Sequence, residues 1–310
     1  MGKKYIVGVD LGATNVKFGL INENRIVLKR VLPTRGFTSK ENLISGLCEN
    51  VKRLLSIAGL SRKDILGLGI GLPGPIDSRK GIVHYFPNIK GWRNVALRRI
   101  IQKKMGLAVF IDNDANLMSL AEARLGAAKG KKNIVGVTLG TGVGGGILVG
   151  GSLYRGSGLV AGEIGHIPLN EKGPKCNCGA IACLERYIGN RYILENARKS
   201  FGKNISLEGL SLLANQGSGK ARKIWMEVAG HLGVALAGVV NFFNPDIIVI
   251  GGGISNAGRI MLDKVREVIK SRAMPIQGKG VRVVRAKLGN DAGMFGAGLL
   301  VEEGLSKNGL

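Results

Sequence analysis

The sequence predicts an α/β protein with two domains. Its 310 residues exceed what a single hydrophobic core usually holds. Short apolar strands alternate with segments in which apolar residues recur at helical spacing. The heptapeptide IVGVDLG at residues 6–12 returns as IVGVTLG at residues 134–140, with six of the seven positions identical. We therefore expect a duplicated strand–turn–strand unit, one copy in each domain.

The first half of the chain predicts five strands and a long helix. Three strands are expected around residues 5–10, 16–21 and 25–31. A helix should begin at Thr38, because Thr38 and Glu41 match a capping box and an apolar stripe follows. Two further apolar strands are expected at residues 64–71 and 107–112, and the second leads into the acidic sequence DND.

The second half is mainly helical. Helical patterns cover residues 184–201, 219–243 and 258–272, and residues 246–250 form a buried type of strand. A last helix from about Asp291 is rich in small residues, which favours close packing against a neighbour. We place one domain at residues 1–115 plus 290–310 and the larger one at residues 116–289.

The charge of the chain is strongly basic, at +24 with a pI near 10.2. Nucleic-acid or polyphosphate binding is one interpretation, and a solvated basic surface is the other. The basic residues are spread over many segments without a nucleic-acid motif, which favours the second. The N-terminal residues contain no hydrophobic signal core, and apolar stretches such as residues 232–240 are short and interrupted by glycine. We expect a cytoplasmic protein with no membrane partner.

Two glycine-rich loops follow the repeated strands and are candidates for phosphate binding. Glycine lets backbone N–H groups approach an anion, a threonine hydroxyl can donate to it, and Asp10 can hold hydrated Mg²⁺. The candidate residues are Asp10, Gly12, Ala13, Thr14 and Lys17 in the first loop and Gly140, Thr141, Gly142, Gly144 and Gly145 in the second.

Two similar loops in separate halves imply a nucleotide held in the cleft between the domains. The alternative is a pair of tight glycine hairpins without a ligand. Neither loop is a P-loop or a Rossmann fingerprint, since each leads into a strand. Gly252 and Gly253, between a buried strand and a helix, are weaker candidates for contact with adenine.

One histidine and three cysteines lie within 18 residues: His166, Cys176, Cys178 and Cys183. An imidazole and three thiolates form a four-coordinate structural zinc set. In a reducing compartment this density of cysteine indicates metal rather than disulfides. The alternative is three unbound cysteines and a hydrogen-bonded histidine. Cys48 lies on a helical apolar stripe and is expected in the core.

The sequence DNDAN marks the point where a strand ends and a helix begins. Asp114 can accept a proton from an attacking hydroxyl, and Asn113 can orient that hydroxyl. The alternative is capping of the helix N-terminus by either residue. Spacing alone favours the cap, while the neighbouring phosphate loops favour the catalytic interpretation.

Taken together, the motifs resemble the ROK family of sugar kinases and sugar-responsive repressors. They occur in the family's order across nearly the whole chain: DLGATNVK, DNDAN, LGTGVGGG, GEIGHIPL, CNCGAIACLE and GGGIS. The resemblance implies a two-domain actin-like ATPase (ribonuclease H-like) fold whose interdomain cleft closes on a sugar. One departure is Ala182, where the family usually has glycine between the last two cysteines.

The resemblance also implies roles for individual residues. Asp114 would be the catalytic base, and the glycine loops would hold the phosphates of ATP with Mg²⁺. His166 would ligate zinc through one nitrogen and face the sugar with the other. Asn88, in the segment FPNIKGW, resembles the sugar contact of glucokinase-type members. The expected sugar contacts are Asn88, Asn113, Glu163, His166 and Glu185.

Glucose is the expected sugar, giving glucose 6-phosphate as in glycolysis. Alternatives are kinases of N-acetylmannosamine, N-acetylglucosamine, fructose or allose, a polyphosphate-dependent glucokinase, and a sugar sensor without catalysis. Repressors of the family carry a helix-turn-helix domain before the first phosphate loop, and this chain reaches Asp10 almost at once. We therefore expect no nucleic-acid partner, and by resemblance a homo-oligomer, either dimer or tetramer.

Overall fold

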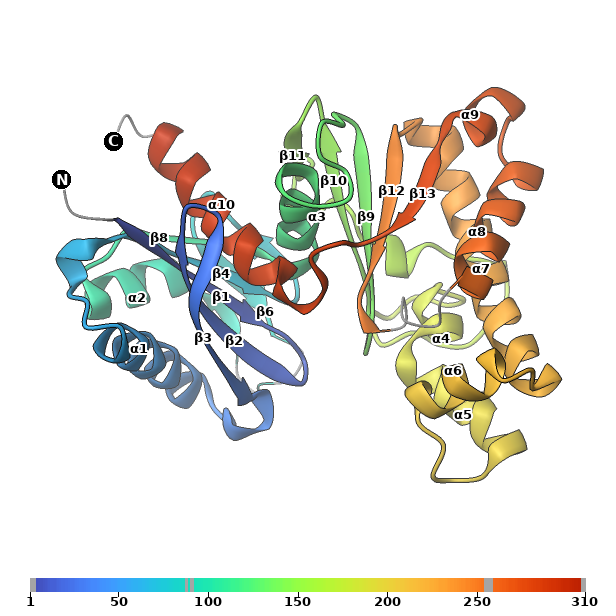
Figure 1. The fold of residues 1–310 in the computed structure, drawn as a ribbon, viewed down its shortest axis with the longest axis horizontal. Coiled ribbons are helices and arrows are strands. Elements are labelled where there is room, and N and C mark those ends of the chain that lie inside the picture. Colours follow the sequence, from blue (N-terminus) through green and yellow to red (C-terminus); the bar gives the residue numbers. More distant parts are fainter. Residues whose placement is uncertain (1–3, 87–88, 90–91, 254–258, 308–310) are drawn as a thin grey trace. The chain divides into compact units, whose positions relative to one another are not determined.

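The computed structural model describes residues 4–86, 89, 92–253 and 259–307. The chain forms two compact units (Figure 1). The first unit combines Met1–Ala121, Tyr154–Ala161 and Asn290–Leu310. The second unit combines Glu122–Leu153 and Gly162–Gly289. Each unit has its own hydrophobic core and its own five-stranded sheet.

The two sheets repeat the same topology. In spatial order the first consists of β3 (Arg25–Pro33), β2 (Asn15–Asn22), β1 (Tyr5–Leu11), β4 (Ile65–Leu72) and β8 (Val109–Asn113). The second consists of β11 (Ser152–Tyr154), β10 (Val143–Val149), β9 (Ile134–Leu139), β12 (Ile247–Gly251) and β13 (Arg282–Arg285). In the first sheet, β1 pairs antiparallel with β2 and parallel with β4. In the second, β9 pairs antiparallel with β10 and parallel with β12. The duplication predicted from the repeated heptapeptide is confirmed.

The described residues of the first unit form four α-helices wholly or in part: α1 (Lys40–Ile57), α2 (Leu97–Met105), α3 (Asp114–Arg124) and α10 (Ala292–Lys307). The helix predicted from Thr38 begins two residues later, because the hydroxyl of Ser39 accepts a hydrogen bond from the N–H of Asn42 and caps it. A small antiparallel sheet follows β4, made of β5 (Ile76–Asp77), β6 (Ile82–Tyr85) and β7 (Arg93–Val95).

The small residues of α10 pack against the first sheet, as predicted. A Cβ atom at Gly8 or Gly69 of the sheet would overlap the backbone of Met294 or Ala297. These glycines in β1 and β4 let the helix backbone lie directly on the sheet. The close approach holds α10 on β1, which leads into the first glycine loop, and on β4, which pairs with the strand that leads into the DNDAN sequence.

Six α-helices are described in the second unit: α4 (Glu185–Ile188), α5 (Asn190–Phe201), α6 (Leu207–Asn215), α7 (Gly219–Phe243), α8 (Arg259–Arg272) and α9 (Pro275–Gly280). Short 3₁₀ helices occur in both units at Thr34–Gly36, Arg62–Asp64, Ile164–His166 and Gly289–Asp291. The centre of the second core is α7, which buries Trp225, Leu232 and Leu236.

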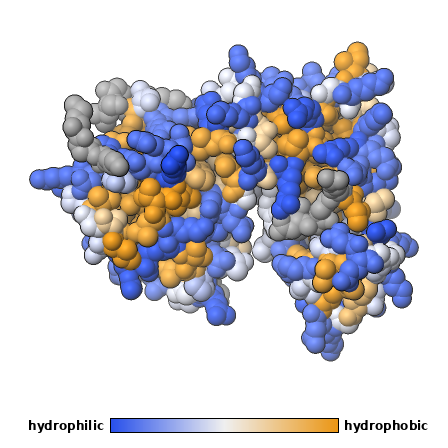
Figure 2. Space-filling model, in the orientation of Figure 1, coloured by the Kyte–Doolittle hydropathy of each residue, from blue (hydrophilic) through white to orange (hydrophobic). Residues whose placement is uncertain are grey.

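At 25 residues, α7 covers the range predicted for it, residues 219–243, and contains the apolar stretch at 232–240. Within the described part of the chain, it is the one helix long and apolar enough to cross a membrane by length and composition. The core helix of a globular domain meets the same criteria, and α7 contributes eleven buried residues to the core. Figure 2 shows hydrophilic residues over most of the visible face of both units, with hydrophobic residues in small groups.

Candidate functional site

The first glycine loop joins β1 to β2. Asp10 and Lys17 lie opposite each other in the antiparallel pair, and the Lys17 ammonium donates to the Asp10 carboxylate at 3.1 Å. The same ammonium donates to the carbonyl of Asn290 at 2.8 Å. The turn closes through a hydrogen bond from the Gly12 N–H to the Asn15 carbonyl at 2.9 Å. Lys17 thus fixes the Asp10 carboxylate at the start of the loop.

Thr34 supports this loop, although no motif in the sequence marks it. Its hydroxyl donates to the Gly12 carbonyl at 2.7 Å, and its N–H donates to the Thr14 carbonyl at 2.8 Å. Its side chain is buried, whereas Ala13 and Thr14 are exposed. The loop therefore has a fixed base and an accessible tip.

Asn113 and Asp114 lie where β8 runs directly into α3. The side-chain oxygen of Asn113 accepts from the N–H groups of Ala115 (2.9 Å) and Asn116 (3.3 Å), and its side-chain amide donates to the Gly74 carbonyl. Asp114 also accepts from the Ala115 N–H, at 2.9 Å. The capping interpretation is therefore confirmed for Asn113, which accepts from the N–H groups two and three residues ahead. Asp114 is half-buried and is the first residue of α3, and its bond to the adjacent N–H is not a cap.

The first unit brings these two groups of residues to one edge of its sheet. In the parallel pairing of β1, β4 and β8, Asp10 is level with Gly71, and Gly71 is level with Asp112. The first glycine loop and Asp114 therefore both follow the carboxyl ends of parallel strands. Ligands of open α/β sheets bind at this edge.

The second glycine loop joins β9 to β10 and is tied to Glu185. The Glu185 carboxylate accepts from the Val143 N–H at 2.9 Å, and a Cβ atom at Gly142 would lie 2.5 Å from the same oxygen. Inside the loop, the Gly140 N–H donates to the Gly142 carbonyl at 3.0 Å. Thr141, at the tip, is exposed. Glu185 thus supports the loop, in addition to the sugar contact implied for it by resemblance.

The other predicted glycines of this unit lie beside that loop. Gly252 has a φ of +87° and approaches the Leu139 backbone so closely that a Cβ atom would overlap it. Gly253 is exposed, with open space where a side chain would be. Gly144 and Gly145 lie inside β10 rather than in the turn, and Gly145 makes room for the carbonyl of Gly162.

The four predicted zinc ligands meet in the second unit. One ligand atom from each of His166, Cys176, Cys178 and Cys183 lies within 4.8 Å of all the others. Two of these separations are 3.7 Å: Cys176 Sγ to His166 Nδ1, and Cys178 Sγ to Cys183 Sγ. Ligand atoms at about 2.0–2.3 Å from a tetrahedral zinc ion would have separations of this size. The donor set and its spacing fit a closed structural zinc site.

The surroundings of the cluster also suit a metal. Burial raises the pKa of the Cys183 thiol to about 12, whereas a backbone hydrogen bond at Ala180 lowers that of Cys178. A bound zinc ion would stabilise both thiolates. Ala182 is buried with a φ of +56°, a left-handed conformation that glycine adopts more easily. This conformation accounts for the family's glycine at the position.

Glu163 and His166 connect the cluster to the predicted sugar contacts. His166 turns Nδ1 towards Cys176, and its Nε2 lies 3.9 Å from the Glu163 carboxylate. Burial raises the pKa of Glu163, and the nearby Glu185 adds to this effect while His166 opposes it. The second unit therefore groups two carboxylates and one imidazole nitrogen beside the second glycine loop.

Asn88 lies outside the described residues. Of the described residues near it in the sequence, Phe86 and Trp92 are both buried, with ring centroids 5.4 Å apart. Both aromatic residues belong to the core of the first unit.

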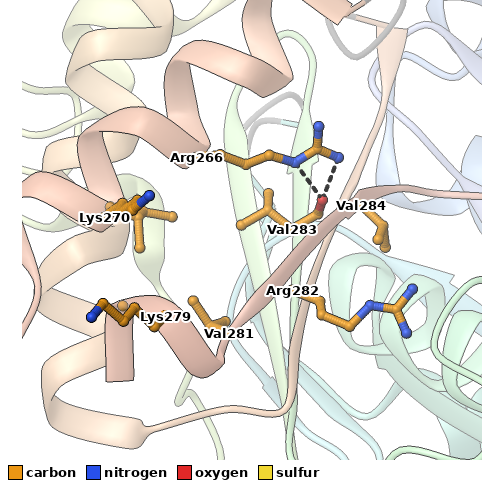
Figure 3. Close-up of a pocket in the computed structure, with 9 residues that line it drawn as sticks. Arg266, Lys270, Lys279, Val281, Arg282, Val283 and Val284 are labelled. Carbon is orange, nitrogen blue, oxygen red and sulfur yellow. Dashed lines mark hydrogen bonds between the residues drawn. The ribbon is translucent and has the colours of Figure 1, made fainter. Parts of the chain in front are cut away.

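A cavity of about 440 Å³ on the second unit lies apart from these residues (Figure 3). It is bounded by α8, α9 and β13. Arg266 closes one side by donating twice to the Val283 carbonyl, at 3.0 and 2.7 Å, and it pairs with Asp263. None of the predicted site residues lines this cavity.

Comparisons with known proteins match the chain over nearly its whole length. The profile described as ROK family covers residues 6–304. A glucokinase of Thermotoga maritima is 36% identical over 98% of this chain and 99% of its own. A xylose repressor of Caldicellulosiruptor bescii is 33% identical over 94% of this chain and 76% of its own.

Solved structures give the same match. A ROK family glucokinase from Streptomyces griseus, in complex with glucose and AMPPNP, has a TM-score of 0.84 and 30% identity. The alignment covers 96% of this chain and 99% of that one. The prediction of a two-domain actin-like α/β fold is confirmed.

Proposed function

This chain belongs to the ROK family, and we propose that it transfers the γ-phosphate of ATP to glucose, forming glucose 6-phosphate. It is a sugar phosphotransferase, as its similarity to glucokinases and to a glucokinase complex with an ATP analogue indicates. The observation that supports the proposal best is the placement of Asp114. Its carboxylate follows the same edge of the first sheet as the phosphate loop that begins at Asp10.

In this proposal Asp114 removes the proton from the attacking sugar hydroxyl. Its place in the first turn of α3 limits the directions in which its carboxylate can point, which suits a general base. Glu163, Glu185 and the Nε2 atom of His166 would bind sugar hydroxyls. Asn88 and the amide of Asn113 would complete the contacts.

The glycine loops would bind the phosphates of ATP. The small residues of both loops would let anionic oxygens approach the backbone N–H groups at the loop tips, and Thr14 and Thr141 would add exposed hydroxyls. Asp10 would hold Mg²⁺, which neutralises charge on the transferred phosphoryl group. Gly252 and Gly253 would lie against the adenine.

We further propose a structural zinc ion at the His166 cluster, which has no obvious open coordination position. It would fix the loop between Glu163 and Glu185. The protein would be a soluble, cytoplasmic enzyme that assembles as a dimer or tetramer and binds no nucleic acid. We keep the division proposed from the sequence, with one domain at residues 1–115 plus 290–310 and the other at residues 116–289.

Purified zinc-loaded protein should be assayed with Mg²⁺–ATP and each of five sugars: glucose, N-acetylglucosamine, N-acetylmannosamine, fructose and allose. We expect the highest kcat/KM with glucose. A higher kcat/KM with an N-acetyl sugar would show that this sugar, and not glucose, is the substrate of the same reaction. Turnover with polyphosphate but not with ATP would show that polyphosphate is the phosphate donor. Sugar binding without turnover would favour the sensing function of the repressor relatives.

A further inference from the structure

Asp112, two residues before the proposed base, is a carboxylate almost removed from water. It is 2% exposed and lies in β8. One of its oxygens accepts from the Asn113 N–H at 2.7 Å and from the Asn116 amide at 3.0 Å. These bonds tie the end of β8 to the first turn of α3.

The other oxygen of Asp112 is bound by Arg155. The guanidinium donates through Nε at 2.8 Å and through Nη2 at 2.5 Å. The Arg155 side chain is 19% exposed, so the pair is largely shielded from water. A buried carboxylate without a counterion is strongly destabilising, and here the counterion comes from 43 residues away in the sequence.

Arg155 is itself held in place. Its carbonyl accepts from the Ala161 N–H at 2.9 Å, which closes residues 155–161 into a loop. This loop belongs to the first unit although the chain on either side of it belongs to the second. The guanidinium therefore reaches Asp112 from a loop with a defined conformation.

We propose that Arg155 is a positioning residue for phosphoryl transfer, acting on Asp114 through the carboxylate of Asp112. The inference rests on the proposed function. Arg155 fixes Asp112, and Asp112 fixes Asn113 and Asn116, which flank Asp114 in the first turn of α3. Because a misplacement of about 1 Å can cost roughly 10²-fold in rate, loss of this anchor should act on kcat.

The test compares Arg155→Met, Arg155→Lys and the control Arg266→Met. Arg266 also forms an ion pair and two bonds to a carbonyl, but it lies at the cavity between α8 and β13. We expect Arg155→Met to lower kcat about 10- to 100-fold with an unchanged glucose dissociation constant. Arg155→Lys should recover part of this loss, since its ammonium can still reach Asp112. Arg266→Met should lower the melting temperature and leave kcat unchanged.

A second readout does not require turnover. Amide hydrogen exchange of residues 113–118 should accelerate in Arg155→Met and stay at the wild-type rate in Arg266→Met. Wild-type kcat in Arg155→Met, or an equal loss of kcat in Arg266→Met, would overturn the inference. If the wild-type protein phosphorylates no sugar, the proposed function fails, and unchanged exchange in Arg155→Met would overturn the positioning role independently.

Discussion

Asn113 caps α3, and the catalytic proposal depends on Asp114, the first residue of the helix. We predict that Asp114→Asn lowers kcat by about 10²–10⁴-fold, because the amide keeps the shape but cannot accept the proton. Glucose binding, measured by calorimetry, should persist. Asp77→Asn is a suitable control, because the Asp77 carboxylate also accepts a nearby backbone N–H, that of Lys80, but has no part in the proposed chemistry. Near-wild-type turnover in Asp114→Asn would show that Asp114 is not the catalytic base.

Residue chemistry was predictable where ligands are close in sequence. Three cysteines and a histidine within 18 residues were sufficient to predict the zinc ligands. Thr34 and Arg155 were not predictable, since each makes its decisive contacts with backbone or carboxylate groups 20 or more residues away. No local pattern marks such a residue, and only the folded chain shows its partner.

At the scale of elements, the packing of α10 on the first sheet depends on glycine. We predict that Gly69→Ala destabilises the protein by about 1–3 kcal/mol, because the new methyl group would overlap the backbone of Ala297. Urea unfolding measures the loss. Gly36→Ala is the matched control, since a Cβ atom there meets nothing within 4 Å. Equal stability of the two variants would contradict this packing.

The junction of β9 and β12 depends on Asp246. Its carboxylate accepts from the N–H groups of Asn133 (2.8 Å) and Lys132 (3.2 Å). These bonds lower the pKa of Asp246, and the bond from Asn133 has the larger effect. A lowered folded-state pKa adds stability above the unfolded value, near 3.9, and this stability is lost as the pH falls through the folded value.

We therefore predict that Asp246→Asn is less stable than wild type at neutral pH. The difference should shrink as the pH falls below about 4. Thermal unfolding between neutral and acid pH measures it, with the exposed Glu23→Gln as the control. A difference that is independent of pH would show that the Asp246 charge is not involved.

Long periodic elements were predicted well, and short ones were not. The longer strands of both sheets and the helices α7 and α8 carry clear apolar patterns, whereas β11 and β13, with three and four residues, were not predicted. The strands β5 to β7 have two to four residues each and α9 has six, too few to show a period. The start of α1 was predicted two residues early, because Thr38 and Ser39 are both good caps and only the structure distinguishes them.

For the whole molecule, the repeated topology explains why one heptapeptide was so informative. Both copies form the central strand of a five-stranded sheet and lead into a glycine hairpin. The sequence could not show that Tyr154–Ala161 belongs to the first unit, because its flanking residues belong to the second. Contacts far apart along the chain determine that assignment.

Stability should depend on zinc. We predict one zinc ion per chain, and a lower melting temperature after chelation or in Cys178→Ala. A loss of about 2 kcal/mol would lower the melting temperature by roughly 4–8 °C in a domain of this size. Cys48→Ala should keep its zinc, since Cys48 lies in the core of the first unit. Full zinc content and unchanged melting in Cys178→Ala would contradict the site.

The most direct test of sugar phosphorylation is the product itself. Wild-type protein should be incubated with glucose and Mg²⁺–ATP, and both ADP and phosphorylated sugar quantified by phosphorus NMR. We predict that glucose 6-phosphate and ADP form in equal amounts, and that neither forms when glucose is omitted. ADP without a phosphorylated sugar, or neither product from folded protein, would contradict it.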